Sequence, residues 1–369
     1  MPIDRVALLA EILVDHSLRV KPGERVLLEG TIIAEPLLNA LYELILQRGG
    51  NPHPLIKLPS QDQALYQFGA AEQITHMDHL RDWAYENFEA RINIHSLTDL
   101  EALAAVPPQK QALREQVSGK ILSTQLKRSA AKEFKWVTTL YPTAAYAQQA
   151  GMSLEEYQDF VFAACLADGR HADPAAEWQS RQTWQAELIS RLEGHDKVEI
   201  KGPNVDLAFS IKGRKFLNSH GRRNMPDGEI HSSPVEDSVD GWVRFSYPAI
   251  RKGRLVEGVE LTFQNGVVAE ARAEGNQDYL LHIIDSDPGA RRVGEIAIGT
   301  NYAIQRFTGN ILFDEKIGGT FHLALGSGYP ESGSQNTSSI HWDMICDLRE
   351  DSQILVDGEL IYQNGKALD

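Results

Sequence analysis

Two residues near the C-terminus have the types and the spacing of metal ligands. His341 and Asp343 lie two residues apart in the segment 339–348 (SIHWDMICDL), with apolar residues at alternate positions. Because successive side chains of a strand point to opposite faces, these two would share one face while Trp342 and Met344 pack on the other. An imidazole and a carboxylate placed in this way can reach one divalent cation, or two neighbouring cations. A half-exposed strand with its polar face toward water gives the same alternation.

A second histidine lies in a segment of the same kind. In 320–325 (TFHLAL), Phe321 and Leu323 would fill one face of a strand, and His322 and Ala324 the other. The small side chain of Ala324 leaves room for a ligand beside the imidazole. Taken alone, the pattern also fits a core histidine that is hydrogen-bonded to the backbone.

Two glutamates and a tyrosine complete the set of candidate functional residues. Glu229 ends a turn sequence, 224–229 (NMPDGE), and Glu295 precedes an apolar strand in 294–299 (GEIAIG). Such carboxylates can be solvated ends of strands, but with two imidazoles they can also hold a dinuclear metal centre. Tyr329 follows a glycine-containing turn, where it would be either a packing aromatic or a phenol close to an oxyanion.

The order Glu, Glu, His, Tyr, His-x-Asp along the chain resembles that of a known family. The segments that carry the resemblance are 224–229 (NMPDGE), 236–238 (EDS), 287–292 (DPGARR), 294–295 (GE), 310–316 (NILFDEK), 322–326 (HLALG) and 341–343 (HWD). They are similar to those of the M29 metallopeptidases, the family of aminopeptidase T. The match is dense from about residue 224 to 348, and the order of helices and strands before it is compatible with the family.

The resemblance implies a metal-dependent aminopeptidase, a hydrolase that removes N-terminal residues from peptides with a free N-terminus. It implies a co-catalytic pair of divalent ions, Zn²⁺, Co²⁺ or Mn²⁺, and a homodimer. The implied metal ligands are Glu229, Glu295, His322, His341 and Asp343, with Tyr329 at the metal centre.

Three side chains, two of them from this set, are assigned roles in catalysis as hypotheses. We expect Glu295 to bridge the ions or to handle a proton, and Tyr329 to donate a hydrogen bond to the oxyanion. Glu315 is a reserve candidate for the general base, although its neighbour Lys316 equally predicts a structural ion pair.

Two other functions use the same residues. A mononuclear iron dioxygenase that cleaves rings, as found among relatives of this fold, would need only His322, His341 and Asp343. The presence of Glu229 and Glu295 favours the dinuclear hydrolase instead. A metal-stabilised scaffold protein is the non-enzymatic alternative, but a site rich in carboxylates is poorly suited to structural zinc.

Composition and charge describe the protein that carries this site. The 369 residues include 36 Lys and Arg against 51 Asp and Glu, a formal net charge of −15, which disfavours nucleic acid and anionic membranes as partners. The only cysteines are Cys165 and Cys346, so no disulfide framework is expected. Residues 1–20 lack the pattern of a secretory signal, and we expect a cytoplasmic location.

The elements that would position the site change in character along the chain. Helices over 4–18 and 36–48 alternate with strands over 25–28, 54–58, 90–94 and 136–140, which predicts a doubly wound α/β domain with a mostly parallel sheet. After Gly194 strands and hairpins dominate, and Asn265-Gly266 predicts a type I′ turn. We therefore expect an N-terminal α/β domain, 1–194, and a mixed α+β domain with antiparallel strands, 195–369, that binds the metal and carries out catalysis.

Overall fold

The computed structural model describes residues 4–251 and 253–368, which form two compact units. The first unit contains the chain up to Trp178 together with residues 221–226. The second contains residues 179–220 and the chain from Asp227 onward. The division lies within helix α9 (Pro174–Ser190), whereas the sequence analysis placed one boundary at Gly194. Within the described residues, no helix is long and apolar enough to cross a membrane.

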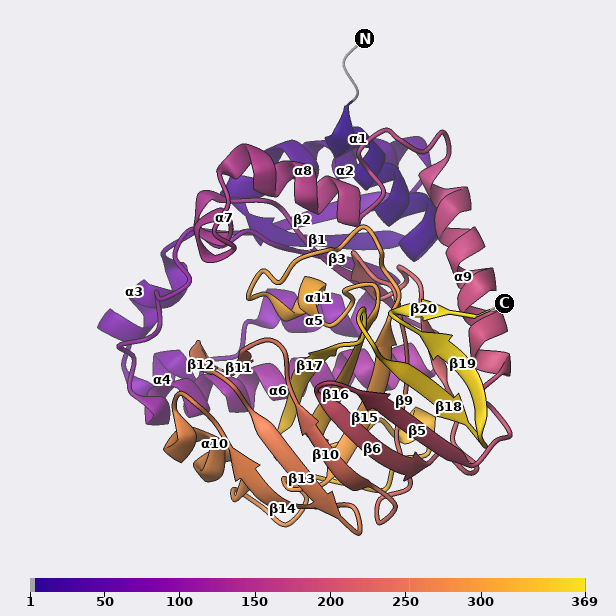
Figure 1. Ribbon diagram of the computed structural model, residues 1–369. Coiled ribbons are helices and arrows are strands. Elements are labelled where there is room, and N and C mark those ends of the chain that lie inside the picture. Colours follow the sequence, from indigo (N-terminus) through magenta and orange to yellow (C-terminus); the bar gives the residue numbers. More distant parts are fainter. Residues whose placement is uncertain (1–3, 252, 369) are drawn as a thin grey trace. The chain divides into compact units, whose positions relative to one another are not determined.

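The first unit is built on a parallel sheet with the strand order β2-β1-β3-β4-β8 (Figure 1). The sheet consists of β1 (Arg25–Thr31), β2 (Asn51–Lys57), β3 (Ala90–His95), β4 (Lys135–Leu140) and β8 (Asn224–Met225). Every pairing in it is parallel. The predicted doubly wound α/β architecture is therefore confirmed.

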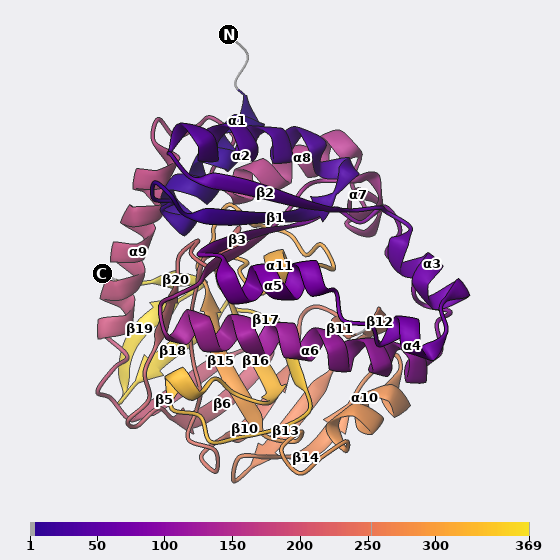
Figure 2. The same cartoon turned by 180° about the vertical axis from the view of Figure 1, so that it is seen from behind.

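Helices cover both faces of this sheet because its strands are apolar on both sides. Val26 and Leu28 of β1 point into one cluster, which α1, the π-helix η1, α2 and α8 complete, while Leu27 points to the opposite cluster with α5 and α6. Figure 2 shows α1 and α2 on one side of β1 and β2, and α5 and α6 on the other. The helices are α1 (Arg5–Glu11), η1 (Ile12–Leu18), η2 (Ile32–Ala34), α2 (Glu35–Gln47), α3 (Gln61–Phe68), α4 (Ala71–Ile74), α5 (His79–Asn87), α6 (Pro108–Ala130), α7 (Ala144–Gln149) and α8 (Leu154–Ala164).

A buried carboxylate connects four of these elements. Glu29 of β1 accepts hydrogen bonds from Arg81 (2.6 Å) and Tyr85 (2.8 Å) of α5 and pairs with Arg91 of β3. Arg91 in turn donates to Gln125 of α6 at 2.7 Å. Burial opposes ionisation of Glu29, but the charges of the two arginines outweigh it and lower the pKa of the carboxyl. Glu29 is thus an ionised side chain in the interior of the first unit.

The second unit contains two larger antiparallel sheets and a short hairpin. One sheet has the order β14-β13-β10-β6-β5-β18-β19-β20, and the other has the order β17-β16-β15-β9-β7. The strands are β5 (Lys197–Gly202), β6 (Val205–Ser210), β7 (Leu217–Ser219), β9 (Glu229–Ser232), β10 (Asp240–Arg244), β11 (Ala249–Arg251), β12 (Arg254–Val256), β13 (Glu260–Gln264), β14 (Val267–Arg272), β15 (Val293–Gly299), β16 (Thr320–Gly326), β17 (His341–Asp347), β18 (Gln353–Val356), β19 (Glu359–Gln363) and β20 (Lys366–Ala367). Besides the part of α9 from Gln179 onward, the helices are α10 (Gln277–Ile284), α11 (Ile311–Asp314) and the 3₁₀ turn η3 (Pro330–Ser332).

One apolar core lies between the two larger sheets. Leu207 and Phe263 enter it from the eight-stranded sheet, and Ile296, Leu323 and Met344 from the five-stranded sheet. This sandwich agrees with the strand-rich second domain that the sequence predicted.

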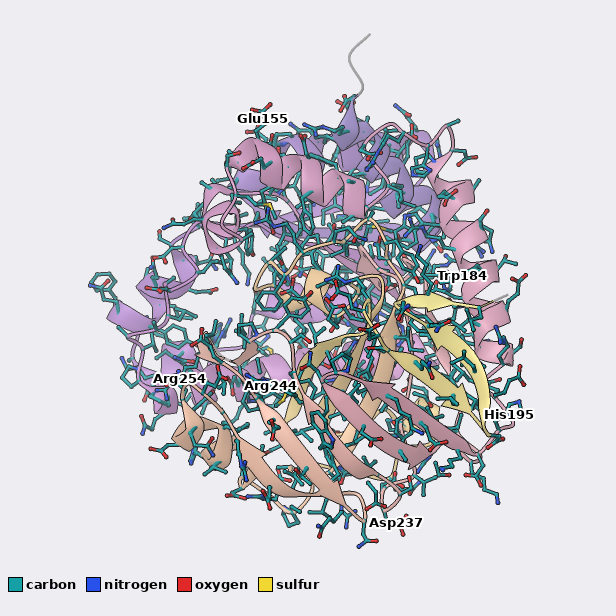
Figure 3. The ribbon with its side chains drawn as sticks, in the orientation of Figure 1. Glu155, Trp184, His195, Asp237, Arg244 and Arg254 are labelled. Carbon is teal, nitrogen blue, oxygen red and sulfur yellow. The ribbon has the colours of Figure 1, made fainter. Side chains whose placement is uncertain are left out.

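Exposed side chains such as Glu155 and Asp237 point away from the ribbon (Figure 3).

The hairpin signals in the sequence are also confirmed by the backbone. Asn265 and Gly266 connect β13 to β14 with φ angles of 50° and 75°. Two residues with positive φ are the requirement of a type I′ turn. The structure therefore explains why a short polar residue and a glycine occur at this position.

Replacing Glu29 by Gln tests the buried ion cluster. The change leaves two arginines without their counter-charge, so we expect the free energy of unfolding to fall by about 3–5 kcal/mol at pH 7. Because the pKa of Glu29 is lower in the folded chain, its contribution is present above pH ~4.5 and is lost as the pH falls below that value. Urea denaturation between pH 3 and 7 should therefore show that the free energy of unfolding falls less on acidification in Glu29→Gln than in the wild type. The exposed Glu86→Gln on α5 is the control, with a change within about 0.5 kcal/mol.

Candidate metal centre

Four adjacent strands of the second unit present ionisable side chains on one face. The order β17-β16-β15-β9 places these strands side by side, and residues two apart on each share a face. The residues on this face are Glu229 and His231 of β9, Glu295 of β15, His322 of β16, and His341 and Asp343 of β17. The residues between them, such as Ile230, Ile296, Leu323 and Trp342, belong to the core on the opposite face. The alternation predicted for β16 and β17 is therefore confirmed.

Small residues separate these side chains across the strands. The register pairs Ala297 with both His231 and His322, and it pairs Ala324 with both Glu295 and Asp343. Both alanines are buried, with at most 3% of their surface exposed. A larger side chain at either position would fill the space into which the polar groups point.

Glu295 lies at the middle of the cluster, and its two oxygens face different histidines. Oε1 is 2.9 Å from His231 Nδ1 and 3.9 Å from His322 Nε2. Oε2 is 3.2 Å from His341 Nε2. This carboxylate therefore connects two groups of side chains.

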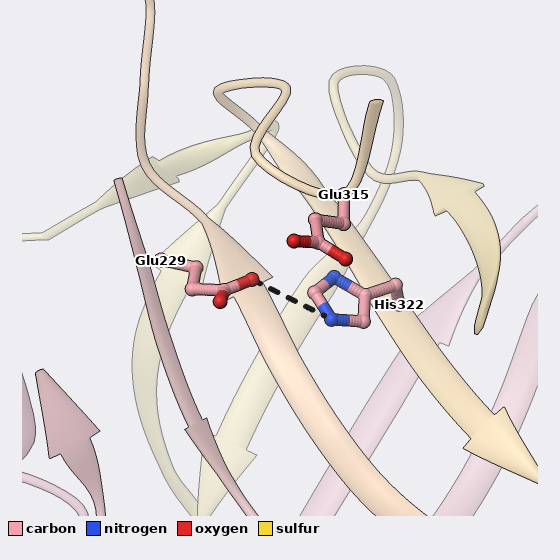
Figure 4. A group of neighbouring side chains, drawn as sticks. All are labelled: Glu229, Glu315 and His322. Atoms are coloured by element: carbon pink, nitrogen blue, oxygen red, sulfur yellow. Dashed lines mark ion pairs between the residues drawn. The ribbon is translucent and has the colours of Figure 1, made fainter. Parts of the chain in front are cut away.

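Each group contains a further carboxylate. Beside Oε1, Glu229 Oε2 lies 3.7 Å from His322 Nε2, as Figure 4 shows. Beside Oε2, Asp343 Oδ1 lies 3.4 Å from His341 Nε2. Glu315, which follows α11, joins Glu229 and His322, and potential ligand atoms of these three lie within 4.8 Å of one another.

These separations fit the edges of a metal coordination polyhedron. Ligand atoms about 2.1 Å from a tetrahedral ion lie about 3.4 Å apart, and the distances above range around this value. Glu229 Oε2 is buried and has no hydrogen-bond partner among the described residues. An acceptor oxygen in that position lacks a hydrogen-bond donor, and a divalent ion would satisfy it.

The tautomer of His341 also fits metal binding. Its Nδ1 is 2.7 Å from the carbonyl oxygen of Ser327, which can only accept, so Nδ1 carries the proton. When Nε2 gives up its proton, it presents a lone pair toward Glu295 and Asp343. A backbone carbonyl that fixes the ring in this way is a common partner of metal-binding histidines.

The electrostatics show an excess of negative charge in this pocket. For His322 and His341, burial disfavours the charged form, but the neighbouring carboxylates outweigh it and raise the pKa to about 9 and about 12, respectively. Burial likewise opposes ionisation of Glu295, yet the three histidines hold its pKa well below the usual value. The site therefore binds protons tightly, and a divalent cation would replace them.

A buried lysine stands next to this cluster. Lys316 is fully buried and pairs with Glu315, and the charges of Glu229 and Glu315 outweigh burial and raise the pKa of the ammonium. Burial raises the pKa of Glu315 to about 8. The ion pair considered from the sequence is thus present, and it holds the Glu315 carboxylate beside Glu229 and His322.

Tyr329 lies at the edge of the site rather than among the ligand groups. Its ring makes T-shaped contacts with His231 and with His341, each with centroids 5.5 Å apart. The residue is 42% exposed, while burial and the nearby carboxylates raise the pKa of its phenol.

The sequence analysis missed His231 and gave Glu315 only a reserve role. His231 follows Glu229 by two residues, the same spacing as His341 and Asp343, and this signal was present in the sequence. It was overlooked because Glu229 was interpreted as the end of a turn rather than as the first residue of a strand.

A comparison with protein families decides the assignment. The model of the thermophilic metalloprotease family M29 matches residues 4–366. The chain belongs to the M29 family. It is therefore a metallopeptidase, a hydrolase that depends on a divalent metal, and the resemblance found from the motifs is confirmed.

Characterised M29 relatives are similar along most of this chain. Aminopeptidase T of Thermus thermophilus is 26% identical over 354 residues, covering 88% of this chain and 85% of the relative. Aminopeptidase 2 of Geobacillus stearothermophilus is 26% identical over 402 residues, covering 96% of each chain.

Two solved structures share the fold of this M29 protein. Wild-type AmpT from Thermus thermophilus superposes with a TM-score of 0.85 at 22% identity and covers 99% of each chain. The 2,5-dihydroxypyridine dioxygenase of Pseudomonas putida KT2440 gives a TM-score of 0.59 at 14% identity, covering 100% of this chain and 98% of that one. The α/β and antiparallel architecture is thus that of a solved M29 enzyme.

A glycine sets the position of Glu295 in this M29 site. The register between β15 and β16 shifts between Val293 and Glu295, so Gly294 lies in a bulge. A Cβ at Gly294 would lie 2.3 Å from the carbonyl oxygen of Gly326 and 2.5 Å from that of Ser327. Only a residue without a side chain permits this approach, and the same Ser327 carbonyl accepts from His341.

Replacing Gly294 by Ala should disturb the metal centre through the backbone. The added methyl group forces the bulge away from residues 326–327, so we expect a loss of about 1–3 kcal/mol in the free energy of unfolding and weaker zinc binding. Urea denaturation and titration of the metal-free protein with zinc measure the two effects. The control is Gly119→Ala in α6, where no described atom lies within 4 Å and a gain of about 0.5–1 kcal/mol is expected. Zinc affinity equal to that of the wild type in Gly294→Ala would contradict the assigned role of the bulge.

Proposed function

We propose that this chain is an aminopeptidase whose site would hold two divalent ions, with Glu295 as a ligand shared by both. The observation that carries the proposal is that the two oxygens of Glu295 face two different sets of ligands. Glu229 and His322 lie beside Oε1, and His341 and Asp343 lie beside Oε2. Zn²⁺, Co²⁺ and Mn²⁺ all suit such a set of nitrogen and oxygen ligands without thiolate.

The residues around the ions supply the remaining parts of peptide hydrolysis. When bound, the two metal ions would lower the pKa of a water molecule and polarise the scissile carbonyl. Glu315, held by Lys316 beside Glu229 and His322, takes the proton from the attacking water and passes it to the leaving amine. Tyr329 donates a hydrogen bond from its phenol to the oxyanion that develops on the substrate.

The excess of carboxylates gives a reason for cleavage at the N-terminus. A free α-amine is a cation below its pKa of about 8, and it is attracted to acidic side chains. Asp343 and His341 are only partly buried, and the half-exposed Tyr329 packs against His341. A peptide with an unblocked N-terminus therefore matches the charge of the site, and a blocked one does not.

The proposal also includes a cytoplasmic homodimer. The buried, unpaired cysteines Cys165 and Cys346 are compatible with a reducing compartment. The dimer is supported by the family resemblance.

A mononuclear iron dioxygenase is the weaker alternative. The dioxygenase of Pseudomonas putida shares the fold at 14% identity. His322, His341 and Asp343 would form a two-histidine, one-carboxylate iron site. Glu229, Glu295 and Glu315, which lie within the same cluster, have no role in that chemistry.

Replacing Glu295 by Gln tests the bridging role. An amide presents one oxygen and one nitrogen donor, so it cannot serve both ligand sets, and we expect peptidase turnover to fall on the order of 1,000-fold. Metal content of the purified variant should fall below that of the wild type, while its circular dichroism spectrum is unchanged. Glu270→Gln, at an exposed position of β14, is the control and should keep both metal and turnover. Normal turnover in Glu295→Gln would remove the bridge from the mechanism.

Substrate and metal requirements test the aminopeptidase assignment as a whole. We expect metal-free protein to be inactive and to recover hydrolysis of a peptide with a free N-terminus after addition of Zn²⁺, Co²⁺ or Mn²⁺. The same peptide with an acetylated N-terminus should remain intact, because it lacks the cationic amine. Two bound ions per chain in elemental analysis support the dinuclear site. One bound iron with oxygen consumption, and no peptide hydrolysis with any of the three cations, would favour the dioxygenase.

A further inference from the structure

His231 shares the face of β9 that carries Glu229. Ile230, between them, is fully buried in the core and is paired with Ile298 of β15, so the register of the strand fixes both polar side chains on the opposite face. Potential ligand atoms of Glu229, His231 and Glu295 lie within 4.8 Å of one another. The histidine thus belongs by position to the metal centre, although the family motif does not include it.

His231 and Glu295 are in close contact as an ion pair. Nδ1 is 2.9 Å from Oε1, yet this buried nitrogen forms no hydrogen bond with any described residue. Two ligands of one ion have a separation of this order, because both lie about 2.1 Å from a common point.

The surroundings hold the ring in this position. Ala297 pairs with His231 on one side and with His322 on the other, which leaves the space between the two imidazoles open. The ring of Tyr329 packs edge-on against His231 at 5.5 Å. The side chain of His231 is 12% exposed, so it is fixed within the site and is not a surface group.

We propose that His231 is a direct ligand, through Nδ1, of the ion held by Glu229, His322 and Oε1 of Glu295. This inference rests on the proposed dinuclear function and adds a third imidazole to it. The centre then has two imidazoles at one ion and one at the other. A larger number of nitrogen ligands favours Zn²⁺ and Co²⁺ over Mn²⁺.

The competing role for His231 is that of an outer partner that only orients Glu295. Such a partner donates a hydrogen bond to the ligand carboxylate and does not touch the ion. His231→Asn separates the two roles, because an amide can still donate to Glu295 but is a poor ligand for zinc. His282→Asn is the matched control, since His282 is exposed on α10.

Zinc competition with a chromophoric chelator measures both variants. We expect the dissociation constant of one of the two zinc ions to rise more than about 100-fold in His231→Asn, beyond the roughly 10–100-fold cost of losing an outer partner. Zinc binding by His282→Asn should equal that of the wild type. Unchanged binding by both ions in His231→Asn would overturn the proposal.

A crystal structure of the zinc-loaded wild-type protein, with anomalous difference maps, is the direct test and does not depend on the folding of a variant. We expect a zinc ion about 2.0–2.1 Å from His231 Nδ1. Two bound zinc ions with Nδ1 more than about 3 Å from either would reject His231 as a ligand and leave the dinuclear peptidase intact. Failure of the wild type to bind two ions would instead reject the dinuclear centre, and the role of His231 with it.

Discussion

The accumulation of carboxylates around one small space is the constraint on which this site depends. Glu229, Glu295, Glu315 and Asp343 approach one another more closely than isolated negative charges allow inside a protein. Lys316 is the fully buried cation that offsets part of this charge, and the histidines retain protons for the same reason. The remaining excess is what makes the cluster a receptor for divalent cations and for the ammonium group of a peptide.

The second unit can maintain this arrangement because one sheet serves two purposes. Its inner face contributes Ile296, Leu323 and Met344 to the apolar core, and its outer face carries the ligands on the same four strands. The rigidity that comes from packing is therefore transmitted directly to the ligand atoms. Gln185 of α9 adds to it by donating to the backbone carbonyl of Glu229 at 2.8 Å.

Many of the site residues could be predicted from the sequence, and the residues that were missed have identifiable causes. Alternation identified His322, His341 and Asp343 because each lies in a strand long enough to show its period. His231 escaped because β9 is four residues long and is preceded by a turn. The proximity of Glu315 to Glu229 could not be deduced, since it depends on a connection between distant segments. Likewise, the sequence does not show that residues 221–226 belong to the first unit. Only the two-residue strand β8 pairs with the parallel sheet, and a strand this short has no recognisable pattern.

The two-residue period of the four strands has a consequence for how such a site can change in evolution. Substitutions alter one side chain at a time, but insertion or deletion of a single residue within β9, β16 or β17 would turn the ligands that follow toward the apolar core. The irregularity at Gly294 is the place where β15 already accommodates an unpaired residue. Insertions and deletions among such sequences should therefore occur in the loops that join these strands, while the strands themselves keep a constant length.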